Sequence, residues 1–325
     1  QTAIAGDPGR ISAKDIKLAL GADSGQGEIT ATLGDSPRAD VKFSFPKLDF
    51  DQLLAGATGT APAAADRPPS AAAPTASAAP GSFLTDVEGS VDLSVGTIVY
   101  HGRTAQQIVV RADLSQGVLN LHELGGQFPG NTAIAAAGTI DASKAQPAGG
   151  GKVEIKSARL REFLTWLDVD VSRIPADRLN ALTFSGQIAA TADGNMQIAN
   201  AVAQIDSTTA RGAVTLRTSP RLGIVADLDV DTVNVDAYMP KQAAAPQSAG
   251  SGQSGAGPAG AGGFDATVKA RIARLTYEGN QFEGIAVDAT ASGDKVTFRP
   301  SRIASAAGAN LAWNGTVSGY AGTPS

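Results

Sequence analysis

Cysteine is absent from the 325 residues of this chain. Disulfides, thiolate nucleophiles and cysteine-ligated metal centres are therefore excluded. Histidine is nearly absent as well, because only His101 and His122 could supply an imidazole. Each of the two is replaced by a charged residue in its own internal duplicate, Glu278 or Arg299. This replacement indicates solvated surface positions rather than catalysis or metal binding.

Charged and aromatic residues are also few, at 18% and 5% of the sequence. The 26 basic and 31 acidic residues give a net charge of −5 without a basic stripe, so nucleic-acid binding through counterion release is not expected. No run approaches the roughly 20 apolar residues that a membrane-spanning helix needs. The chain opens at Gln1 without a charged and then apolar signal segment, and we interpret it as a mature or excised part of a longer protein.

The motifs of common enzyme classes are missing too. The sequence contains no Gly-x-Ser-x-Gly elbow, no Walker-type phosphate loop and no His-Glu-x-x-His pair. Asp227, Asp229 and Asp231 alternate along one segment, where a strand would gather their carboxylates on one face and Ca²⁺ could find oxygen ligands. No calcium-loop spacing accompanies them, so a solvated strand face is the expected role. We predict a protein that is not an enzyme and has no catalytic residue, metal ligand or cofactor.

Two segments of low complexity interrupt the chain. Residues 56–82 are rich in Ala and Pro, and residues 241–263 are rich in Gly, Ser and Ala. Neither segment contains a large apolar side chain whose burial could offset the entropy lost on ordering. We predict a linker in each, with ordered surface loops as the alternative.

Most of the remaining sequence alternates between apolar and polar residues. One clear run alternates with Arg111 and Asp113 and consists of Ile108, Val110, Ala112 and Leu114. Strict alternation of period two predicts strands with one apolar face and one wet face. Turn signals such as residues 34–37 (Gly-Asp-Ser-Pro) separate such runs. The expected fold is a long antiparallel meander with few helices.

An internal repeat is the most informative feature of the sequence. Residues 91–140 align without a gap on residues 268–317, at an offset of 177 positions. The matches fall on alternating apolar positions and on turn glycines, as expected for a duplicated array of strands. The copies of the apolar run named above are Ile285, Val287 and Ala289.

A second pattern occurs three times, in residues 42–55, 152–165 and 227–240. Each copy alternates like a strand and closes on an apolar pair, which predicts a strand followed by a short helical turn. We expect Asp51 and Asp236 to cap the turns of the first and third copies, because a short carboxylate accepts bonds from free backbone amides. The second copy continues with apolar residues at helical spacing, which predicts a helix over 158–167.

The repeats and the low-complexity segments together predict five parts. They are the end of one unit at 1–55, a linker at 56–82, a complete unit at 83–240, a linker at 241–263 and the start of the next unit at 264–325.

In this arrangement the sequence resembles the AsmA family of Gram-negative envelope proteins, in particular its C-terminal half. Residues 233–240 (VNVDAYMP) are similar to the family's close of a unit. Residues 274–279 (RLTYEG), with an earlier copy at 98–102, resemble its strand and turn. Residues 314–317 (NGTV) repeat residues 137–140 (AGTI). The resemblance covers nearly all of the chain outside the linkers, and the family's N-terminal membrane helix has no counterpart in it.

The resemblance implies an elongated sheet folded into an open, U-shaped apolar trough, as in bridge-like lipid-transfer proteins. It implies a periplasmic location, tethered to the inner membrane through a segment outside this chain. It also implies a part in phospholipid traffic and outer-membrane assembly. The implied partners are phospholipid or another acyl-chain lipid, the inner-membrane anchor and outer-membrane assembly proteins.

The residues indicate what an open sheet would hold. A sheet with one apolar face and few helices to cover it leaves an apolar groove exposed, and large exposed apolar surfaces mark interaction sites. We predict that this groove holds acyl chains and is lined by Ile108, Val110, Ala112, Leu114, Ile285, Val287 and Ala289. Two alternatives stay open. One is a closed β-sandwich that serves as a structural or adhesin-like repeat, and the other is a scaffold for outer-membrane proteins that adds strands at its edge.

Overall fold

A computed structural model describes residues 3–7, 9–34, 37–58, 87–143, 146–191, 193–218, 221–239, 265–293, 295–306 and 308–318. Strands make up 73% of these residues, and two short helices accompany them. The prediction of a mainly β chain with few helices is confirmed. The chain divides into two compact units, Gln1–Gly151 and Lys152–Ser325. Most of the two predicted linkers, 59–82 and 241–263, lies outside the described residues.

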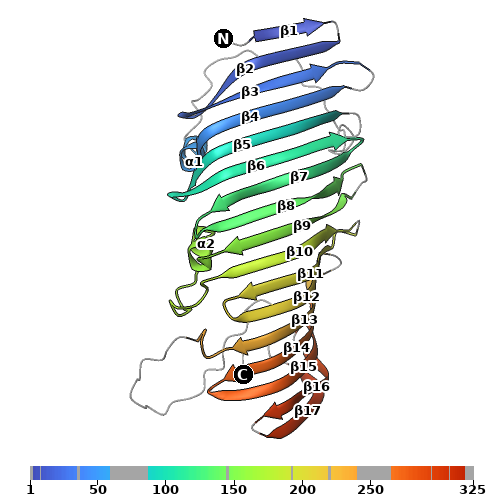
Figure 1. The fold of residues 1–325 in the computed structure, drawn as a ribbon. Coiled ribbons are helices and arrows are strands. Elements are labelled where there is room, and N and C mark those ends of the chain that lie inside the picture. The colour runs from blue at the N-terminus through green and yellow to red at the C-terminus, as the bar shows by residue number, and fades with distance from the viewer. Residues whose placement is uncertain are drawn as a thin grey trace. The chain divides into compact units, whose positions relative to one another are not determined.

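The first unit is a single sheet in which each strand pairs with the next along the chain (Figure 1). Its elements are β1 (Ala3–Asp7), β2 (Arg10–Leu20), β3 (Asp23–Thr32), β4 (Arg38–Asp49), α1 (Phe50–Thr58), β5 (Glu88–Tyr100), β6 (Arg103–Ser115), β7 (Val118–Phe128), β8 (Thr132–Asp141) and the beginning of β9 (Ala148–Ser157). The β4–β5 pair is parallel, and the pairs that precede and follow it, from β1–β2 to β3–β4 and from β5–β6 to β7–β8, are antiparallel. The first three residues of the predicted linker at 56–82 belong to α1.

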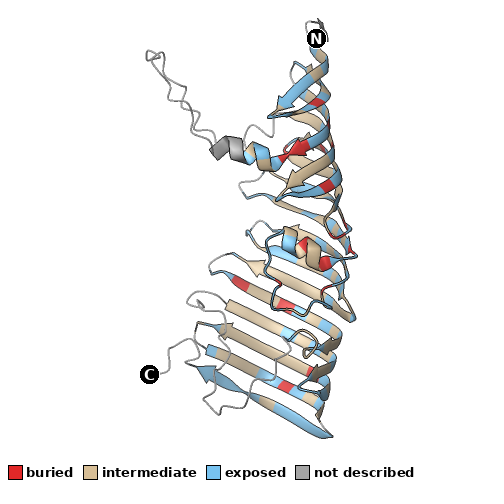
Figure 2. Cartoon of the chain, turned by 90° about the vertical axis from the view of Figure 1, so that its left-hand side faces the viewer, coloured by how far each residue is buried: buried red, intermediate tan, exposed pale blue. Residues whose placement is uncertain are grey.

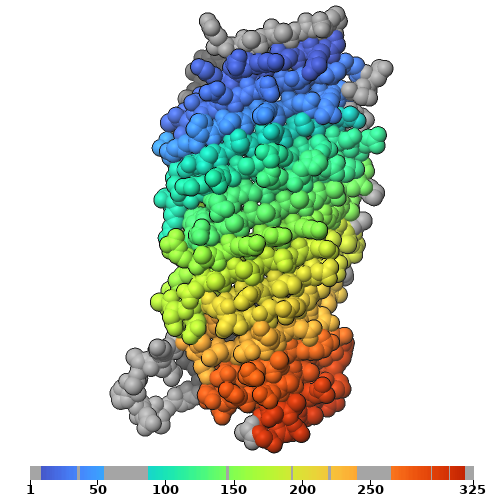
Figure 3. All heavy atoms as spheres, viewed as in Figure 1, coloured from blue at the N-terminus to red at the C-terminus, as the bar shows by residue number. Residues whose placement is uncertain are grey.

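The second unit repeats this arrangement of strands. Its elements are the end of β9, α2 (Leu160–Trp166), β10 (Leu182–Ala190), β11 (Met196–Ile205), β12 (Thr208–Arg217), β13 (Gly223–Asn234), β14 (Asp265–Tyr277), β15 (Asn280–Ser292), β16 (Lys295–Ala306) and β17 (Ala309–Ser318). Strands β10 to β17 pair in chain order, and here β13–β14 is the parallel pair. In the space-filling view, the colours within each unit accordingly follow one another strand by strand (Figure 3).

The strand registers repeat at the offset of 177 that the sequence predicts. In the first unit Tyr100 lies opposite Arg103 and Val95 opposite Ile108. In the second unit Tyr277 lies opposite Asn280 and Ile272 opposite Ile285. A residue with positive φ interrupts the ladder at the same place in both copies, Gln107 (φ 54°) and Gly284 (φ 61°). The duplicated array of strands is therefore a structural repeat as well.

The structure extends the repeat to the strands that precede this array. Strands β2 to β4 match β11 to β13 at an offset of 185, with Leu20 opposite Asp23 in one copy and Ile205 opposite Thr208 in the other. Asp15 (φ 54°) and Asn200 (φ 50°) occupy equivalent irregular positions. Each unit thus contains one copy of the same eight-strand pattern, β1–β8 or β10–β17.

The best-packed part of the first unit lies around the parallel β4–β5 pair. We call such a parallel pair, together with the connection between its two strands, a parallel crossing. Phe45, Leu48 and Val95 are buried against one another, with half-buried apolar neighbours around them. The rings of Phe43 and Phe45 lie over Gly27 and Gly25, where an added Cβ would come within 2.5 Å and 2.4 Å of a ring carbon. Elsewhere in both units most residues are half-buried or exposed, and few are buried (Figure 2). Neither unit contains a second sheet packed on the first, so the closed sandwich is not what the described residues form.

Both helices follow the strands that the sequence predicts to end in a helical turn. Helix α2 lies inside the predicted range 158–167, and α1 is a full helix of 9 residues rather than a single turn. The predicted capping role of Asp51 and Asp236 is wrong. The caps are the side chains two positions earlier: Asp49 accepts from the Gln52 amide at 3.1 Å, and Asn234 accepts from the Ala237 amide at 3.1 Å.

Asp51 and Asp236 instead hold the turn of the neighbouring hairpin. The Asp51 carboxylate accepts hydrogen bonds from the backbone amides of His101 and Gly102, both at 2.8 Å. Both turn residues have positive φ, as in the tight turns that match the twist of paired strands. Asp236 holds the equivalent turn of the second unit in the same way, through the amides of residues 278 and 279 at 2.6 Å and 2.9 Å.

Candidate functional site: the apolar sheet faces

The predicted groove residues of the first unit share one face of β6. Ile108, Val110 and Ala112 lie directly opposite Val95, Leu93 and Val91 on β5, and Leu114 lies opposite Gly89. On the far side of β5, the parallel partners on β4 are Phe45, Phe43 and Val41. Paired residues share a face, so the three strands present one apolar surface. Arg111 and Asp113 lie on the opposite face, as predicted.

The copies in the second unit are placed in the same way. Ile285, Val287 and Ala289 on β15 lie opposite Ile272, Ala270 and Val268 on β14. The parallel partners of those β14 residues on β13 are Val230, Leu228 and Ala226. Ile285 and Ala226 are buried, and the other residues of this group are half-buried.

These strands belong to longer rows of apolar side chains that cross the sheet from strand to strand. In the first unit one row runs through β2 to β8 as Ala13, Ile29, Val41, Val91, Ala112, Leu121 and Gly138. The adjacent row consists of Ile11, Ala31, Ala39, Gly89, Leu114, Leu119 and Ile140. Neither row contains a polar side chain.

The second unit contains the matching pair of rows, now traced through β10 to β17. One consists of Ile188, Ile198, Val214, Ala226, Val268, Ala289, Phe298 and Gly315. The other consists of Ala190, Met196, Leu216, Ile224, Ala266, Ala291, Val296 and Val317. Sequence reasoning identified these positions on β6 and β15 only. The rest of each row becomes visible once pairing registers are known, although the period-two alternation that marks them is present in the sequence.

The rows are only partly covered by other described residues. Val95, in the packed cluster, is 2% exposed, whereas Val91, four positions along the same face, is 44% exposed. Ile140 and Val317, at the ends of their rows, are 47% and 53% exposed. Within each unit the face is therefore buried at one place and open to a guest at others.

The opposite face of each unit carries charged residues in alternating sign across the strands. In the first unit Arg111 pairs with Asp92 at 3.6 Å and with Glu123. In the second unit Arg271 pairs with Asp229 at 3.2 Å and with Asp227 at 3.4 Å. These pairs are largely exposed and contribute little to the free energy of unfolding, but they make this face polar and hydrated.

The alternating carboxylates of Asp227, Asp229 and Asp231 are part of this charged face. The Asp229 and Asp227 side chains raise the pKa of the Arg271 guanidinium through a hydrogen bond and through their charge. Asp231 accepts from the Thr209 amide at 2.8 Å, and that bond lowers the pKa of the Asp231 carboxyl. Among the residues that the structure describes, no group of three His, Cys, Asp or Glu side chains is placed to hold a metal ion.

The two histidines are exposed. His101 occupies the hairpin turn held by Asp51, and its ring stacks on Tyr100 with centroids 3.8 Å apart. His122 contacts the carboxylate of Asp113 on the charged face. Both positions are of the solvated kind that the sequence predicts.

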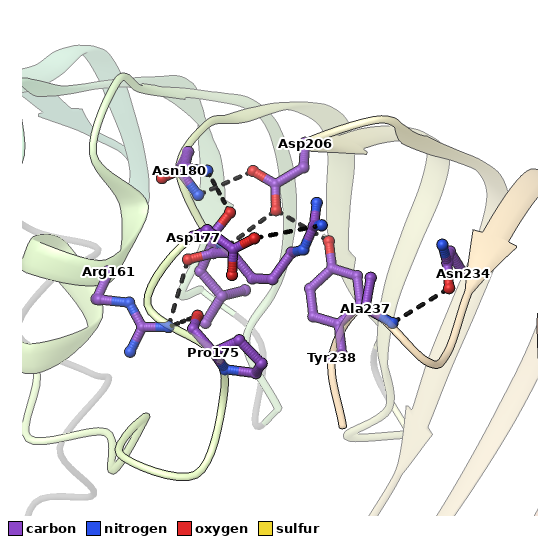
Figure 4. Close-up of polar contacts among 10 residues, drawn as sticks. Arg161, Pro175, Asp177, Asn180, Asp206, Asn234, Ala237 and Tyr238 are labelled. Atoms are coloured by element: carbon purple, nitrogen blue, oxygen red, sulfur yellow. Dashed lines mark hydrogen bonds and ion pairs between the residues drawn. The ribbon is translucent and has the colours of Figure 1, made fainter. Parts of the chain in front are cut away.

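A polar cluster secures the second unit where β9, β11 and β13 end (Figure 4). The Arg161 guanidinium donates to the carbonyls of Val171 and Ile174, both at 2.9 Å, and to that of Pro175. It thereby holds the loop that connects α2 to β10. Arg161 occupies the position that Asp51 has in the first copy of the three-fold pattern.

Asp206 anchors the other end of the same loop. Its carboxylate accepts from the backbone amides of Leu179 and Asn180 at 2.9 Å and 2.8 Å, and from the Tyr238 hydroxyl at 2.9 Å. Burial disfavours the ionised form of Asp206, but the amides of Ala181, Asn180 and Leu179 and the Tyr238 hydroxyl outweigh it and lower the pKa of the carboxyl. The cluster is thus a structural anchor, because the hydrogen bonds of Arg161 and Asp206 go to the loop backbone and to Tyr238, although the buried Nε of Arg161 has no hydrogen-bond partner among the described residues.

In the part of the chain that the structure describes, no helix has both the length and the apolar character to cross a membrane. A comparison with protein-family models gave no match, and comparisons with curated proteins and with solved structures gave none either. Membership of the AsmA family therefore stays a prediction from the sequence.

Proposed function

We propose that the apolar sheet face of each unit binds the acyl chains of phospholipid or of another acyl-chain lipid, without covalent chemistry. The observation that carries the proposal is the pair of adjacent apolar rows that cross the strands of each unit without a polar interruption. Burying each methylene of a guest contributes roughly 0.8 kcal/mol, and this contribution has no direction. A chain held in this way can be bound firmly in total and still shift along the row.

The dimensions of the rows suit such a guest. Neighbouring strands lie about 4.8 Å apart, so a row that crosses seven strands is about 29 Å long. Each leaflet of a bilayer contributes about 15 Å of hydrocarbon. A row therefore exceeds the length of a lipid's apolar part, which leaves room for movement along it.

The charged face is the side of each sheet where an acyl chain is not expected to bind. Ion pairs such as Arg111–Asp92 and Arg271–Asp229 lie on the face that the rows do not use. Inserting a methylene chain there would desolvate charges, which is costly. Binding is therefore restricted to one side of each sheet.

The cellular setting of the proposal rests on the resemblance to the AsmA family. In that setting the chain is the periplasmic part of an envelope protein, tethered to the inner membrane by a segment outside this sequence. It holds or conducts phospholipid acyl chains and supports outer-membrane assembly and lipid homeostasis. Of the alternatives, the closed structural repeat needs apolar faces that meet each other, and the described residues of each unit form one sheet instead.

The test is lipid extraction from the purified chain, followed by mass spectrometry. The chain is produced in the periplasm of a Gram-negative host and purified without detergent. We expect phospholipid in molar amounts comparable to the protein. A lipid content no higher than that of an unrelated periplasmic protein purified in parallel would contradict the proposal.

A further inference from the structure

A further apolar row crosses each unit, and its side chains pack differently in the two copies. In the first unit the row crosses β4, β5 and β6 and consists of Phe45, Val95 and Ile108. In the second unit it crosses β13, β14 and β15 and consists of Val230, Ile272 and Ile285. We call them the Val95 row and the Ile272 row. They are copies of one another at the offsets of 185 and 177 that relate the two units.

In the first unit the large side chains of this row lie over glycines of the neighbouring strands. A Cβ added at Gly25 would lie 2.4 Å from ring carbons of Phe45, and a Cβ added at Gly126 would lie 2.2 Å from the Cδ1 of Ile108. Side chains do not approach one another so closely, so these two positions require glycine. The Val95 row therefore fills the space above its neighbouring strands with its own side chains.

In the second unit both glycines are replaced by residues that have a Cβ. Ala210 stands at the position of the first glycine and Ile303 at that of the second. The large ring is also missing, because Val230 stands where the first unit has Phe45 and lies directly opposite Ala210. The side chains of the Ile272 row cannot lie flat over the neighbouring strands, since those strands carry side chains of their own.

The burial of the two rows differs accordingly. Phe45 and Val95 are buried, at 4% and 2% exposure, whereas their copies Val230 and Ile272 are half-buried. Ile285 is the buried member of the Ile272 row, at 7% exposure. The hydrophobic contribution to binding is roughly proportional to the apolar area that the guest removes from water. Phe45 and Val95 have almost no such area left, and Val230 and Ile272 do.

We propose that the side chains of Phe45 and Ile108 close the Val95 row to acyl chains, whereas the Ile272 row of the second unit is open and binds one. This inference rests on the proposed function and deepens it, because it distinguishes the lipids that the two units accept. The second unit offers a wider apolar surface than the first and accepts a lipid with a broader apolar part, such as one with more acyl chains. Phe45 and Gly25 are then residues that determine specificity.

The test is photo-crosslinking of the full chain with a phospholipid that carries a diazirine near the end of one acyl chain. Digestion and mass spectrometry then locate the labelled residues. In the unaltered chain we expect labelling of Ile272 and several-fold less labelling of Val95. Val91 and Val268, which are copies of one another on the open rows, serve as the reference in each unit and should both be labelled.

Two variants exchange the deciding residues between the copies. Phe45→Val with Gly25→Ala gives the first unit the residues of the second, and should raise the labelling of Val95 several-fold relative to the reference residue of that unit. The double substitution keeps the row apolar, and cooperative thermal unfolding verifies that the variant folds.

The reverse exchange is Val230→Phe with Ala210→Gly. It provides a ring and the glycine beneath it, and should lower the labelling of Ile272 several-fold relative to the reference residue of the second unit. If the first variant does not fold, this variant and the unaltered chain still decide the question.

The outcomes separate this inference from the proposed function. Equal labelling of Val95 and Ile272 in the unaltered chain, or unchanged labelling in a folded variant, would overturn the inference and leave the proposed function standing. Absence of labelling from Val91 and Val268 as well would overturn the proposed function, and this inference with it.

Discussion

Individual Asp and Asn side chains stabilise each parallel crossing through hydrogen bonds. Asp49 and Asn234 cap the chain that leaves β4 and β13, and the carboxylates of Asp51 and Asp236 reach across to the next hairpin turn. The second copy of the pattern, residues 152–165, has arginine at both equivalent positions and continues into a loop held by Arg161. The identity of these side chains therefore separates a crossing from a loop connection, although the strand pattern before them is the same.

The hydrogen bonds that Asp51 accepts from the His101 and Gly102 amides predict that the stability of the fold depends on pH. The amides of Gly102 and His101 lower the pKa of the Asp51 carboxyl below its ordinary value of 3.8. A carboxyl whose pKa is lowered by folding stabilises the fold above its unfolded pKa and loses that contribution as the pH falls through the folded pKa. We expect Asp51→Asn to lower the midpoint of thermal unfolding at pH 7 and to flatten its decline below about pH 4. If the unfolding midpoint declines equally with pH in Asp51→Asn and in the unaltered protein, these hydrogen bonds do not stabilise the fold.

The two sides of β6 predict opposite effects of the same substitution. Val110→Glu places a charge in the apolar surface, where Val110 is half-buried and the carboxylate can still reach water. We expect this variant to fold cooperatively and to lose bound lipid. The matched control is Val109→Glu, on the charged face, which should retain lipid. Outright unfolding of Val110→Glu alone would indicate a closed core, and retained lipid in both variants would remove β6 from the binding surface.

At the scale of elements, the α2 loop depends on one side chain. Arg161→Met keeps most of the apolar stem but removes the donors to three loop carbonyls, which should cost about 2 kcal/mol. We expect faster amide exchange in residues 168–178. Arg173→Met, an exposed arginine of the same loop, serves as the control. If the two variants exchange alike, Arg161 does not hold the loop.

The parallel crossings make a prediction for limited proteolysis. The composition of residues 56–82 and 241–263 predicts preferential cleavage there. Strands β4 and β5 remain paired along 11 residues, and so do β13 and β14. We expect the nicked chain to elute as one species in gel filtration and to separate into fragments only in denaturant. Free release of a fragment near 83–240 under native conditions would show that the parallel pairs are weak.

Much of this element structure was predictable, and the exceptions have physical reasons. Alternation identifies a strand and its apolar face, and the repeat at 177 carries the registers with it. Alternation does not encode strand direction, so β4–β5 and β13–β14 differ from the predicted antiparallel meander. The available signal was the length of the predicted linkers, since parallel strands need a connection of a dozen or more residues. The repeat at 185 is visible in the sequence only over residues 42–55 and 227–240, because in the preceding strands backbone irregularities such as Asp15 and Asn200 are preserved while side chains differ.

At the scale of the molecule, each unit is one sheet with two chemically different faces. One face carries uninterrupted apolar rows, and the other carries exposed ion pairs. The sequence predicted seven groove residues on β6 and β15, and the faces that they share agree with the registers. Three of them, Ala112, Leu114 and Ala289, belong to the pairs of adjacent rows traced above. The proposed binding of acyl chains assigns a use to the face, whereas the curvature of the whole array into a trough stays a prediction.

The most direct test is photo-crosslinking with a phospholipid that carries a diazirine near the end of one acyl chain. After irradiation and digestion, mass spectrometry locates the labelled residues. The account predicts labelling on the rows, at positions such as Val91, Leu121 and Val268, and none at Asp92, Arg111 or Arg271 on the charged face. Labelling spread equally over both faces, or absent from the rows, would contradict the claim that the apolar face is the lipid-binding surface.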